Sequence, residues 1–315
     1  MKEILLLLVM FWNVENYFDT YDNPRTSDED FTPTGDNRWS RKRFEKKRDD
    51  IAKTILLTAD GYGELPALIG LAEIENSFVL KELLEQTPLA RTHYKYIHRE
   101  SPDSRGIDVA LLYREDLFAP VETKYIGFSF PTREVLYTKG VVNGLDTVHI
   151  MVNHWPSKRG NEKSSGKKRE YVSLKVSHTV DSILTRNPGA NIILMGDFND
   201  ESSSPSLKNL WQLTNLSRWA QGCEGSYKYR ENWSTIDQFL VSEGMIKQKK
   251  PTEGTFSPQW IYTHRSMDIF APQVLFTEDA SYMGVKPKRT YSGPRYLGGV
   301  SDHLPIILKV FKGEE

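Results

Sequence analysis

The positions of polar residues relative to the apolar runs constrain the fold of this chain more than any other feature of its sequence. Four predicted strands are followed by polar residues: Ile4–Trp12 by Asn13, Leu65–Ala72 by Glu73, Asp146–Val152 by His154, and Ala190–Met195 by Asp197 and Asn199. Three others open with such residues or follow them: Ile107–Tyr113 carries Asp108, Ile236–Val241 carries Asp237, and Leu304–Val310 comes after Asp302 and His303. If these residues share one site, four strands run toward it and three run away. The sheets must then be mixed or antiparallel. A parallel dinucleotide-binding fold is excluded, because its polar residues gather at the carboxyl ends of the strands.

The remaining segments predict helices and loops around these strands. Helices are expected at Trp39–Leu57, with Ser40 as its N-cap, at Phe78–Glu85, at Glu170–Leu184 and at Ser204–Leu216. Shorter strands are expected at Tyr94–Ile97 and on either side of Pro131, and loops at residues 18–37 and 157–169. Neither a repeat nor a change in composition marks a linker, so residues 1–315 are expected to form a single domain.

Composition describes an ordinary globular chain without a general affinity for polyanions. Of its 315 residues, 38% are hydrophobic and 26% are charged, and the mean hydropathy is −0.52. Lysine and arginine number 41 against 42 acids, so any electropositive site must be local. The single cysteine, Cys223, excludes an internal disulfide and a cysteine-based zinc site.

The amino terminus resembles the beginning of a signal peptide, but other features favour a core strand. The run MKEILLLLVM has a charged start, yet no small-residue cleavage site follows it. It is also shorter than the roughly 20 apolar residues that span a bilayer. We therefore expect the first core strand here and no membrane span. The compartment stays open, because the protein could be cytoplasmic or exported with a signal that precedes this numbering.

The stretch LMGDFND, residues 194–200, is the most suggestive short motif. A buried strand that ends at Gly196 is followed at once by Asp197 and Asn199. A carboxylate and an amide two residues apart place hard oxygen atoms near one point, which suits Mg²⁺ or a phosphate-bound water. An ordinary turn is the alternative, because Asp and Asn are common turn residues.

Each site candidate also has a simpler explanation when it is taken alone. Asn13 could cap a turn, Glu73 could face solvent, and His154 could be a packed loop histidine. The simple explanations weaken when the candidates are considered together, because mixed sheets would let all of them converge. We therefore interpret these residues as one site.

Such a site suits the attack of water on a phosphate ester. Glu73 would bind a divalent cation that neutralises phosphate charge, and either Asp197 or His303 would activate the water. A pair between Asp237 and His303 would fix the imidazole tautomer and raise its basicity. The sequence contains no P-loop, G-x-S-x-G, H-E-x-x-H or G-x-G-x-x-G motif.

Supporting contacts are predicted around these residues. Asp108 or Glu75 could orient His154, and Arg105 could contact phosphate. The loop after His154 is strongly basic, and its cations are Lys158, Arg159, Lys163, Lys167, Lys168 and Arg169, opposed by Glu162 and Glu170. It is either a solvated loop or a surface that gathers anionic substrate, with Lys158 and Arg159 nearest the site.

The ordered set of motifs resembles the endonuclease/exonuclease/phosphatase superfamily. The motifs are WNVEN at Asn13, LAEIEN at Glu73, RGIDVALLY at Asp108, VNHWPS at His154, GDFND at Asp197, TIDQF at Asp237 and SDHLP at His303. The resemblance runs from about residue 9 to 310 and is greatest to bacterial members of unassigned substrate. It implies an α/β fold, a four-layer sandwich in which two packed mixed β-sheets are flanked by helices.

The resemblance also implies roles for individual residues. Glu73 matches the metal-binding glutamate, with Asn13 and Asp302 as nearby ligands of Mg²⁺ or Mn²⁺. Asp197 and Asn199 match the residues that position water and phosphate. His303, paired with Asp237, matches the histidine that contacts the scissile phosphate. His154 matches a position that is histidine in deoxyribonucleases and sphingomyelinases but tyrosine in abasic-site enzymes.

The leading hypothesis is a Mg²⁺- or Mn²⁺-dependent phosphodiesterase of nuclease type. The substrate is expected to be a phosphate ester, with nucleic acid among the candidates, although the balanced net charge argues against strong duplex binding. The alternative is a phosphomonoesterase acting on a phosphorylated sugar, inositol or lipid headgroup. A scaffold without activity is disfavoured because every matched position is filled. We expect a monomer.

Overall fold

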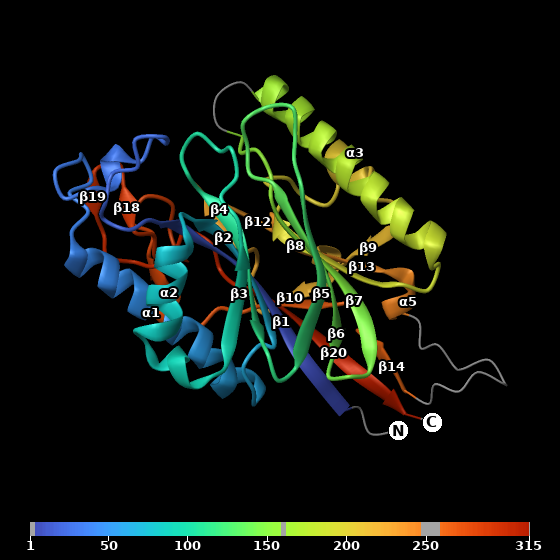
Figure 1. The fold of residues 1–315 in the computed structure, drawn as a ribbon. Coiled ribbons are helices and arrows are strands. Elements are labelled where there is room, and N and C mark those ends of the chain that lie inside the picture. The colour runs from blue at the N-terminus through green and yellow to red at the C-terminus, as the bar shows by residue number, and fades with distance from the viewer. Residues whose placement is uncertain (1–3, 159–161, 247–258, 315) are drawn as a thin grey trace, which may run out of the picture.

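Two large mixed β-sheets pack face to face in the computed structural model, which describes residues 4–158, 162–246 and 259–314. Helices α1 (Arg41–Tyr62) and α2 (Ser77–Glu85) cover the outer side of one sheet (Figure 1). Helix α3 (Glu162–Arg186) covers the outer side of the other. The predicted mixed α/β sandwich is confirmed.

The first sheet has the order β10-β15-β20-β1-β2-β4-β3, with β14 also paired to β20. Its strands are β1 (Ile4–Tyr17), β2 (Leu68–Ile74), β3 (Tyr94–His98), β4 (Asp108–Arg114), β10 (Ala220–Gln221), β14 (Gln259–Tyr262), β15 (Met267–Ile269) and β20 (Ile306–Glu314). The two central strands, β1 and β2, run parallel, and β20 and β4 flank them antiparallel. Strands therefore both end and begin at the same edge, as the polar residues predict.

The second sheet has the order β5-β6-β7-β8-β13-β9. Its strands are β5 (Phe118–Ile126), β6 (Val135–Val142), β7 (Asp146–His154), β8 (Asn191–Asp197), β9 (Leu213–Asn215) and β13 (Asp237–Ser242). Strands β7 and β8 are parallel, whereas β13 is antiparallel to β8. Three two-stranded ribbons complete the described strands: β11 (Tyr227–Tyr229) with β12 (Asn232–Ser234), β16 (Phe276–Glu278) with β17 (Val285–Pro287), and β18 (Tyr291–Ser292) with β19 (Arg295–Tyr296).

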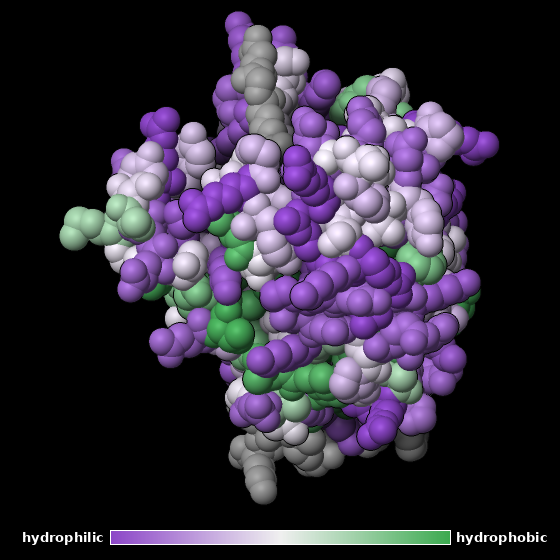
Figure 2. Space-filling model, turned by 90° about the vertical axis from the view of Figure 1, so that its left-hand side faces the viewer, coloured by the Kyte–Doolittle hydropathy of each residue, from purple (hydrophilic) through white to green (hydrophobic). Residues whose placement is uncertain are grey.

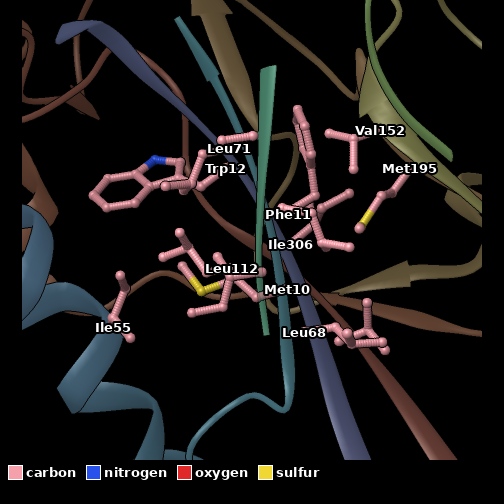
Figure 3. Close-up of a cluster of buried hydrophobic side chains, with 14 of the residues drawn as sticks. Met10, Phe11, Trp12, Ile55, Leu68, Leu71, Leu112, Val152, Met195 and Ile306 are labelled. Atoms are coloured by element: carbon pink, nitrogen blue, oxygen red, sulfur yellow. The ribbon is translucent and has the colours of Figure 1, made fainter. Parts of the chain in front are cut away.

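The core lies on both faces of the first sheet, which explains why β1 is apolar without interruption from Ile4 to Trp12. Successive strand residues point to opposite faces. Figure 3 shows Phe11 on the side of Met195, which belongs to the second sheet, and Trp12 on the side of Ile55 of α1. A strand covered on both faces has no solvent side on which polar residues could alternate.

Two predicted segments differ in the structure. The predicted loop 157–169 is largely helical, because α3 begins at Glu162. Its first inward-facing positions are Ser165 and Arg169, and apolar residues occupy that face only from Val172 onward, so apolar periodicity could not reveal the first two turns. The predicted helix Ser204–Leu216 is also wrong. It is helical only at α4 (Pro205–Lys208), and the chain then forms β9, which pairs with the edge of β13.

The outer surface over α1 is mostly hydrophilic, as Figure 2 shows from the left-hand side of Figure 1. Its cations are largely neutralised by nearby acids, since Arg41 pairs with Glu45 and Glu82, and Lys46 pairs with Asp50. The outer surface over α1 therefore carries charges of both signs. Among the described residues, none of the helices has the length and apolar character that a membrane crossing needs.

Candidate active site

Strand pairing brings the predicted site residues to one edge of the sandwich. In the first sheet, Asn13 pairs with the residue before Glu73. In the second sheet, His154 on β7 pairs with Asp197 on β8, and Asp197 pairs with Asp237 on β13. The sequence predicts each of these strands, and their register in the structure brings the site residues together.

The GDFN segment, residues 196–199, lets β7 and β8 approach closely, and the chain then turns away from the sheet at Asn199. A β-carbon at Gly196 would lie 2.5 Å from the carbonyl oxygen of Asn153 on β7, so only glycine fits there. Asn199 adopts a left-handed conformation with a φ of 51°. Its backbone N–H donates to Oδ1 of Asp197 at 2.9 Å, and its side chain donates to the carbonyl of Trp155 at 3.0 Å. Asn199 therefore helps to fix the orientation of the Asp197 carboxylate.

Asp197 is the central residue of this cluster. Its Oδ2 accepts a 3.0 Å hydrogen bond from Asn13 Nδ2, and it lies 3.7 Å from Nε2 of His154 and 3.9 Å from Nε2 of His303. The carboxylate is buried. Burial, with the nearby charge of Asp237, raises its pKa to about 7, despite the opposing effects of His303 and the hydrogen bonds from Asn199 and Asn13.

The pKa values of the two histidines are shifted in opposite directions. Burial, together with the charges of Arg133 and Arg105, lowers the pKa of His154 well below its ordinary value. Burial also opposes charge on His303, but the carboxylate of Asp237 raises its pKa well above the ordinary range. The predicted pair is present, with Nδ1 of His303 2.8 Å from Oδ2 of Asp237. These surroundings favour the neutral form of His154 and the imidazolium form of His303.

The suggested partners of His154 are wrong. The carboxylate of Asp108 accepts from the backbone and hydroxyl of Ser101 and lies 3.7 Å from Nε2 of His98. Glu75 instead accepts from the backbone N–H of Asp19 at 2.6 Å. Nδ1 of His154 has no hydrogen-bond partner within the part of the chain that the structure describes.

Glu75 gives a test of stability against pH. Burial, and the charges of Asp19, Asp28 and Glu100, raise its pKa from 4.5 to about 8, although the Asp19 N–H bond opposes this rise. Between these two values the folded protein holds a proton that the unfolded chain has lost. Stability therefore falls as the pH rises through this window, with a slope of up to about 1.4 kcal/mol per pH unit.

We expect Glu75→Gln to remove the contribution of Glu75 to this slope and to leave those of Asp197 and Glu15, because the amide oxygen can still accept the Asp19 N–H but does not ionise. Urea unfolding in EDTA at about pH 6 and about pH 9 would measure it. The variant should gain stability relative to the wild type at the higher pH. Parallel stability curves for the two proteins would contradict the expectation.

Three further oxygen-bearing side chains lie near Asp197 and its two histidines. Glu73 has a φ of 64°, and its Oε2 accepts the N–H of Asn16 at 2.7 Å. This leaves Oε1 without a hydrogen bond among the described residues, 3.9 Å from Nε2 of His154. Oδ1 of Asp302 also has no hydrogen bond among the described residues, and it lies 3.9 Å from Nε2 of His303. With the amide oxygen of Asn13, these are the hard ligands that Mg²⁺ and Mn²⁺ prefer.

The charge of the site suits a divalent cation. Burial and the nearby charge of Asp237 both raise the pKa of Asp197, so a bound cation would favour the ionised carboxylate. By distance, the described group compact enough to hold one ion is Asp197, Asp237 and His303. However, Nδ1 of His303 and Oδ2 of Asp237 already satisfy each other at 2.8 Å, so we interpret that group as an ion-pair chain. Glu73 and Asp302 fit a metal better, because neither carboxylate lies within hydrogen-bond distance of a histidine and each keeps an oxygen without a hydrogen bond among the described residues.

A comparison with known families decides the affiliation. The profile of the Endonuclease/Exonuclease/phosphatase family matches residues 8–312. The chain belongs to this family. The family resemblance in the sequence motifs is thereby confirmed, and the chain is a hydrolase that acts on phosphoric ester bonds. A comparison with curated proteins gave no match.

Solved structures of endonuclease/exonuclease/phosphatase proteins share the fold at low sequence identity. A family protein from Bacteroides thetaiotaomicron has a TM-score of 0.58 and 16% identity, covering 98% of this chain and 95% of that chain. A mannosyl-6-phosphatase from the same species has a TM-score of 0.58 and 15% identity, covering 96% and 99%. The human Nocturnin catalytic domain has a TM-score of 0.54 and 15% identity, covering 98% and 97%.

The sequence did not reveal the buried ionic group behind the carboxylates of this family site. Glu15 accepts the N–H of Thr290 at 2.7 Å and two bonds of 3.2 Å from Arg289, which also donates to Asp302 at 3.0 Å. Lys47 of α1, fully enclosed, donates to the hydroxyl of Thr290 at 2.6 Å. Burial raises the pKa of Glu15 to about 7 and lowers that of Lys47 to about 8.

Lys47 could have been found from helical spacing. It lies three residues after Phe44 and four before Ile51, which are both buried, so it belongs to the inward face of α1. Arg133 and Ser226 were also missed. Arg133 donates to the carbonyl of Trp155 at 2.6 Å behind His154, and no periodic pattern marks its position.

The structure describes two of the three predicted substrate contacts, Arg105 and Lys158. Arg105 is half-exposed and close enough to His154 to lower its pKa. Lys158 lies 3.4 Å from Oδ1 of Asp200, so part of its charge is neutralised. Arg159 lies outside the described residues.

Arg169 is a structural residue, not a substrate contact. Its guanidinium is buried and donates to Asp200 at 2.7 Å and to the carbonyl of Pro156 at 3.2 Å. We expect Arg169→Ala to destabilise the fold by about 3–5 kcal/mol, because it would leave the Asp200 carboxylate buried without its main partner. Urea unfolding would measure the loss.

Arg186 offers a matched control on the same helix. It is exposed and forms no ion pair within the described part of the chain. Arg186→Ala should change stability by less than about 0.5 kcal/mol. Equal losses for the two variants would show that the Arg169 pair contributes nothing specific.

Proposed function

We propose that this chain is a divalent-metal-dependent phosphodiesterase in which water attacks phosphorus directly. One observation carries the proposal: the buried carboxylate of Asp197 lies 3.7 Å from Nε2 of His154 and 3.9 Å from Nε2 of His303. A carboxylate between two imidazoles can take a proton from water while the imidazoles contact phosphate oxygens.

The charge states favour Asp197 over His303 as the general base. An imidazolium has no free lone pair, so His303 cannot accept a proton while Asp237 keeps it charged. Asp197, with a pKa of about 7, can accept one near neutral pH. The proton of the attacking water passes to Asp197 as the new O–P bond forms and the ester P–O bond breaks, and the leaving alkoxide takes a proton from solvent to depart as the alcohol. His303 then stabilises the negative charge that develops on phosphate.

Glu73, Asp302 and Asn13 are the proposed ligands of Mg²⁺ or Mn²⁺. When bound, the cation would neutralise the charge of the phosphate oxygens. Asn199 would hold Asp197 and line the phosphate site, and Arg105, Lys158 and Arg159 would contact the substrate beyond it. We also propose that the chain acts as a monomer and that residues 1–315 form one domain, a view supported by the family match over 8–312.

A substrate panel tests the proposal. It should contain bis-p-nitrophenyl phosphate and plasmid DNA as diesters, with p-nitrophenyl phosphate and phosphorylated sugars as monoesters. Each would be measured with Mg²⁺, Mn²⁺ and EDTA. We expect metal-dependent cleavage of the diesters. Phosphate release from the monoesters alone would overturn the diesterase and favour the phosphomonoesterase alternative, which the similarity to a mannosyl-6-phosphatase fold keeps in the panel.

A further inference from the structure

Asp237 receives both of its side-chain hydrogen bonds on a single oxygen. Its Oδ2 lies 2.8 Å from Nδ1 of His303 and 2.6 Å from Oγ of Ser226. Its Oδ1 is buried and has no hydrogen-bond partner among the described residues. The carboxylate is fully enclosed. Because no other group among the described residues hydrogen-bonds this carboxylate, the direction of Oδ2 depends on Ser226 as well as on the histidine.

The chain fixes Ser226 tightly. Its side chain is fully buried, and its backbone N–H donates to the carbonyl of Ser234 at 3.0 Å. Its own carbonyl accepts the N–H of Leu304, the residue after His303, at 2.7 Å. A β-carbon at the preceding Gly225 would lie 2.7 Å from the Ser234 carbonyl oxygen, so the backbone can approach β12 only because that residue is glycine.

Ser226 is thus linked to both members of the pair. It is joined through its hydroxyl to Asp237 and through its backbone to the segment that carries His303. The next residue, Tyr227, places its ring 4.8 Å from the His303 ring. A rotation of the Asp237 carboxylate would move the acceptor of Nδ1 and with it the direction of Nε2, which faces Asp197 at 3.9 Å.

We propose that Ser226 is a positioning residue for phosphate ester hydrolysis: its hydroxyl holds the Asp237 carboxylate so that Oδ2 orients His303 toward Asp197 and the phosphate. This inference rests on the proposed function of His303. The alternative is that the Ser226 hydroxyl serves only the local packing of β11, β12 and β13.

The first test compares Ser226→Ala with Ser226→Thr. The alanine variant lacks the hydroxyl and should lower kcat by about 10-fold to 100-fold, with little change in KM. Losses of this size are typical when a group that orients a functional side chain from behind is removed. Threonine keeps the hydroxyl and should restore most of the turnover. Ser242→Ala is the matched control, because Ser242 is buried at the other end of β13 and its hydroxyl bonds only backbone groups, at 2.7 and 3.1 Å. It should alter stability without altering kcat.

A double-mutant cycle separates positioning from packing. If Ser226 acts through Asp237, then Ser226→Ala should have no further effect on kcat in an Asp237→Asn background. If it serves packing alone, the two losses should multiply. The cycle needs only the alanine variant, so it decides the question even if the threonine variant does not fold.

A readout independent of turnover separates failure of this inference from failure of the proposed function. The Nδ1 proton of His303 can be observed by NMR in histidine-labelled protein. Its resonance should shift or broaden in Ser226→Ala, and Ser242→Ala should leave it unchanged. Wild-type protein that cleaves no phosphate ester would overturn the proposed function, and the NMR signal would still test Ser226. An Ser226→Ala variant with wild-type kcat, or with an unchanged Nδ1 signal, would overturn the inference.

Discussion

Replacing Asp197 with asparagine is expected to lower kcat for phosphate ester hydrolysis by about 10²-fold to 10⁴-fold. The amide keeps the shape of the carboxylate but cannot take a proton from water. It also places an uncharged group 3.7 Å and 3.9 Å from the Nε2 atoms of His154 and His303. Steady-state kinetics at saturating Mg²⁺ on the best substrate of the panel would measure the loss.

The fold of this variant is expected to survive. Burial raises the pKa of Asp197 to about 7, so the ionised carboxylate costs stability above that pH, and a neutral amide removes the cost. The melting temperature at about pH 8 should therefore fall little or rise. Asp60→Asn, at an exposed position on α1, is the control and should leave kcat unchanged. An Asp197→Asn variant with full turnover would exclude Asp197 as the base.

The second large effect is expected for Glu73→Gln, which should raise the Mg²⁺ concentration for half-maximal activity by about 100-fold or more. Loss of groups that only support a metal ligand costs about 10-fold to 100-fold, and a direct ligand should cost at least as much. The amide can keep the bond from Asn16, which is 2.7 Å long, but it lacks the charge that Oε1 would bring to the cation. Titration calorimetry with Mg²⁺ and Mn²⁺ would measure the affinity directly.

Glu85→Gln is the control for this measurement, because Glu85 is exposed at the end of α2, away from the site. It should leave metal affinity unchanged. Unaltered metal binding in Glu73→Gln would remove Glu73 from the metal site. The group of Asp197, Asp237 and His303 would then be the candidate metal site, and Asp237→Asn would test it.

The sandwich and the edge that carries the site could be predicted because strand order leaves a pattern in the sequence. An apolar run that stops at a polar residue reports where a buried strand meets solvent, and the two senses of this pattern imply mixed sheets. The adjacency of His154 and Asp197 follows from the parallel register of β7 and β8. The structure bears out this part of the prediction.

The supporting contacts could not be predicted, because they join positions that no local pattern relates. Ser226 lies 11 residues from Asp237, directly before the ribbon strand β11, and Arg289 contacts Glu15 across 274 residues. The partner of His154 was predicted wrongly for the same reason. Asp108 opens a strand at the correct edge, but its carboxylate turns toward Ser101 and His98. Strand position fixes where a backbone lies, whereas side-chain direction depends on neighbours from other segments.

The burial of Lys47 and Glu15 behind the active site has a consequence for the evolution of this protein. Charged side chains without access to water are costly, and apolar residues of similar volume often give a more stable fold. Laboratory selection for heat resistance alone should therefore favour substitutions at Lys47 and Glu15. Because Glu15 holds the Arg289 guanidinium that also binds Asp302, such gains should come with lost turnover. The conflict between robustness and catalysis would thus be concentrated in a few residues behind the active site.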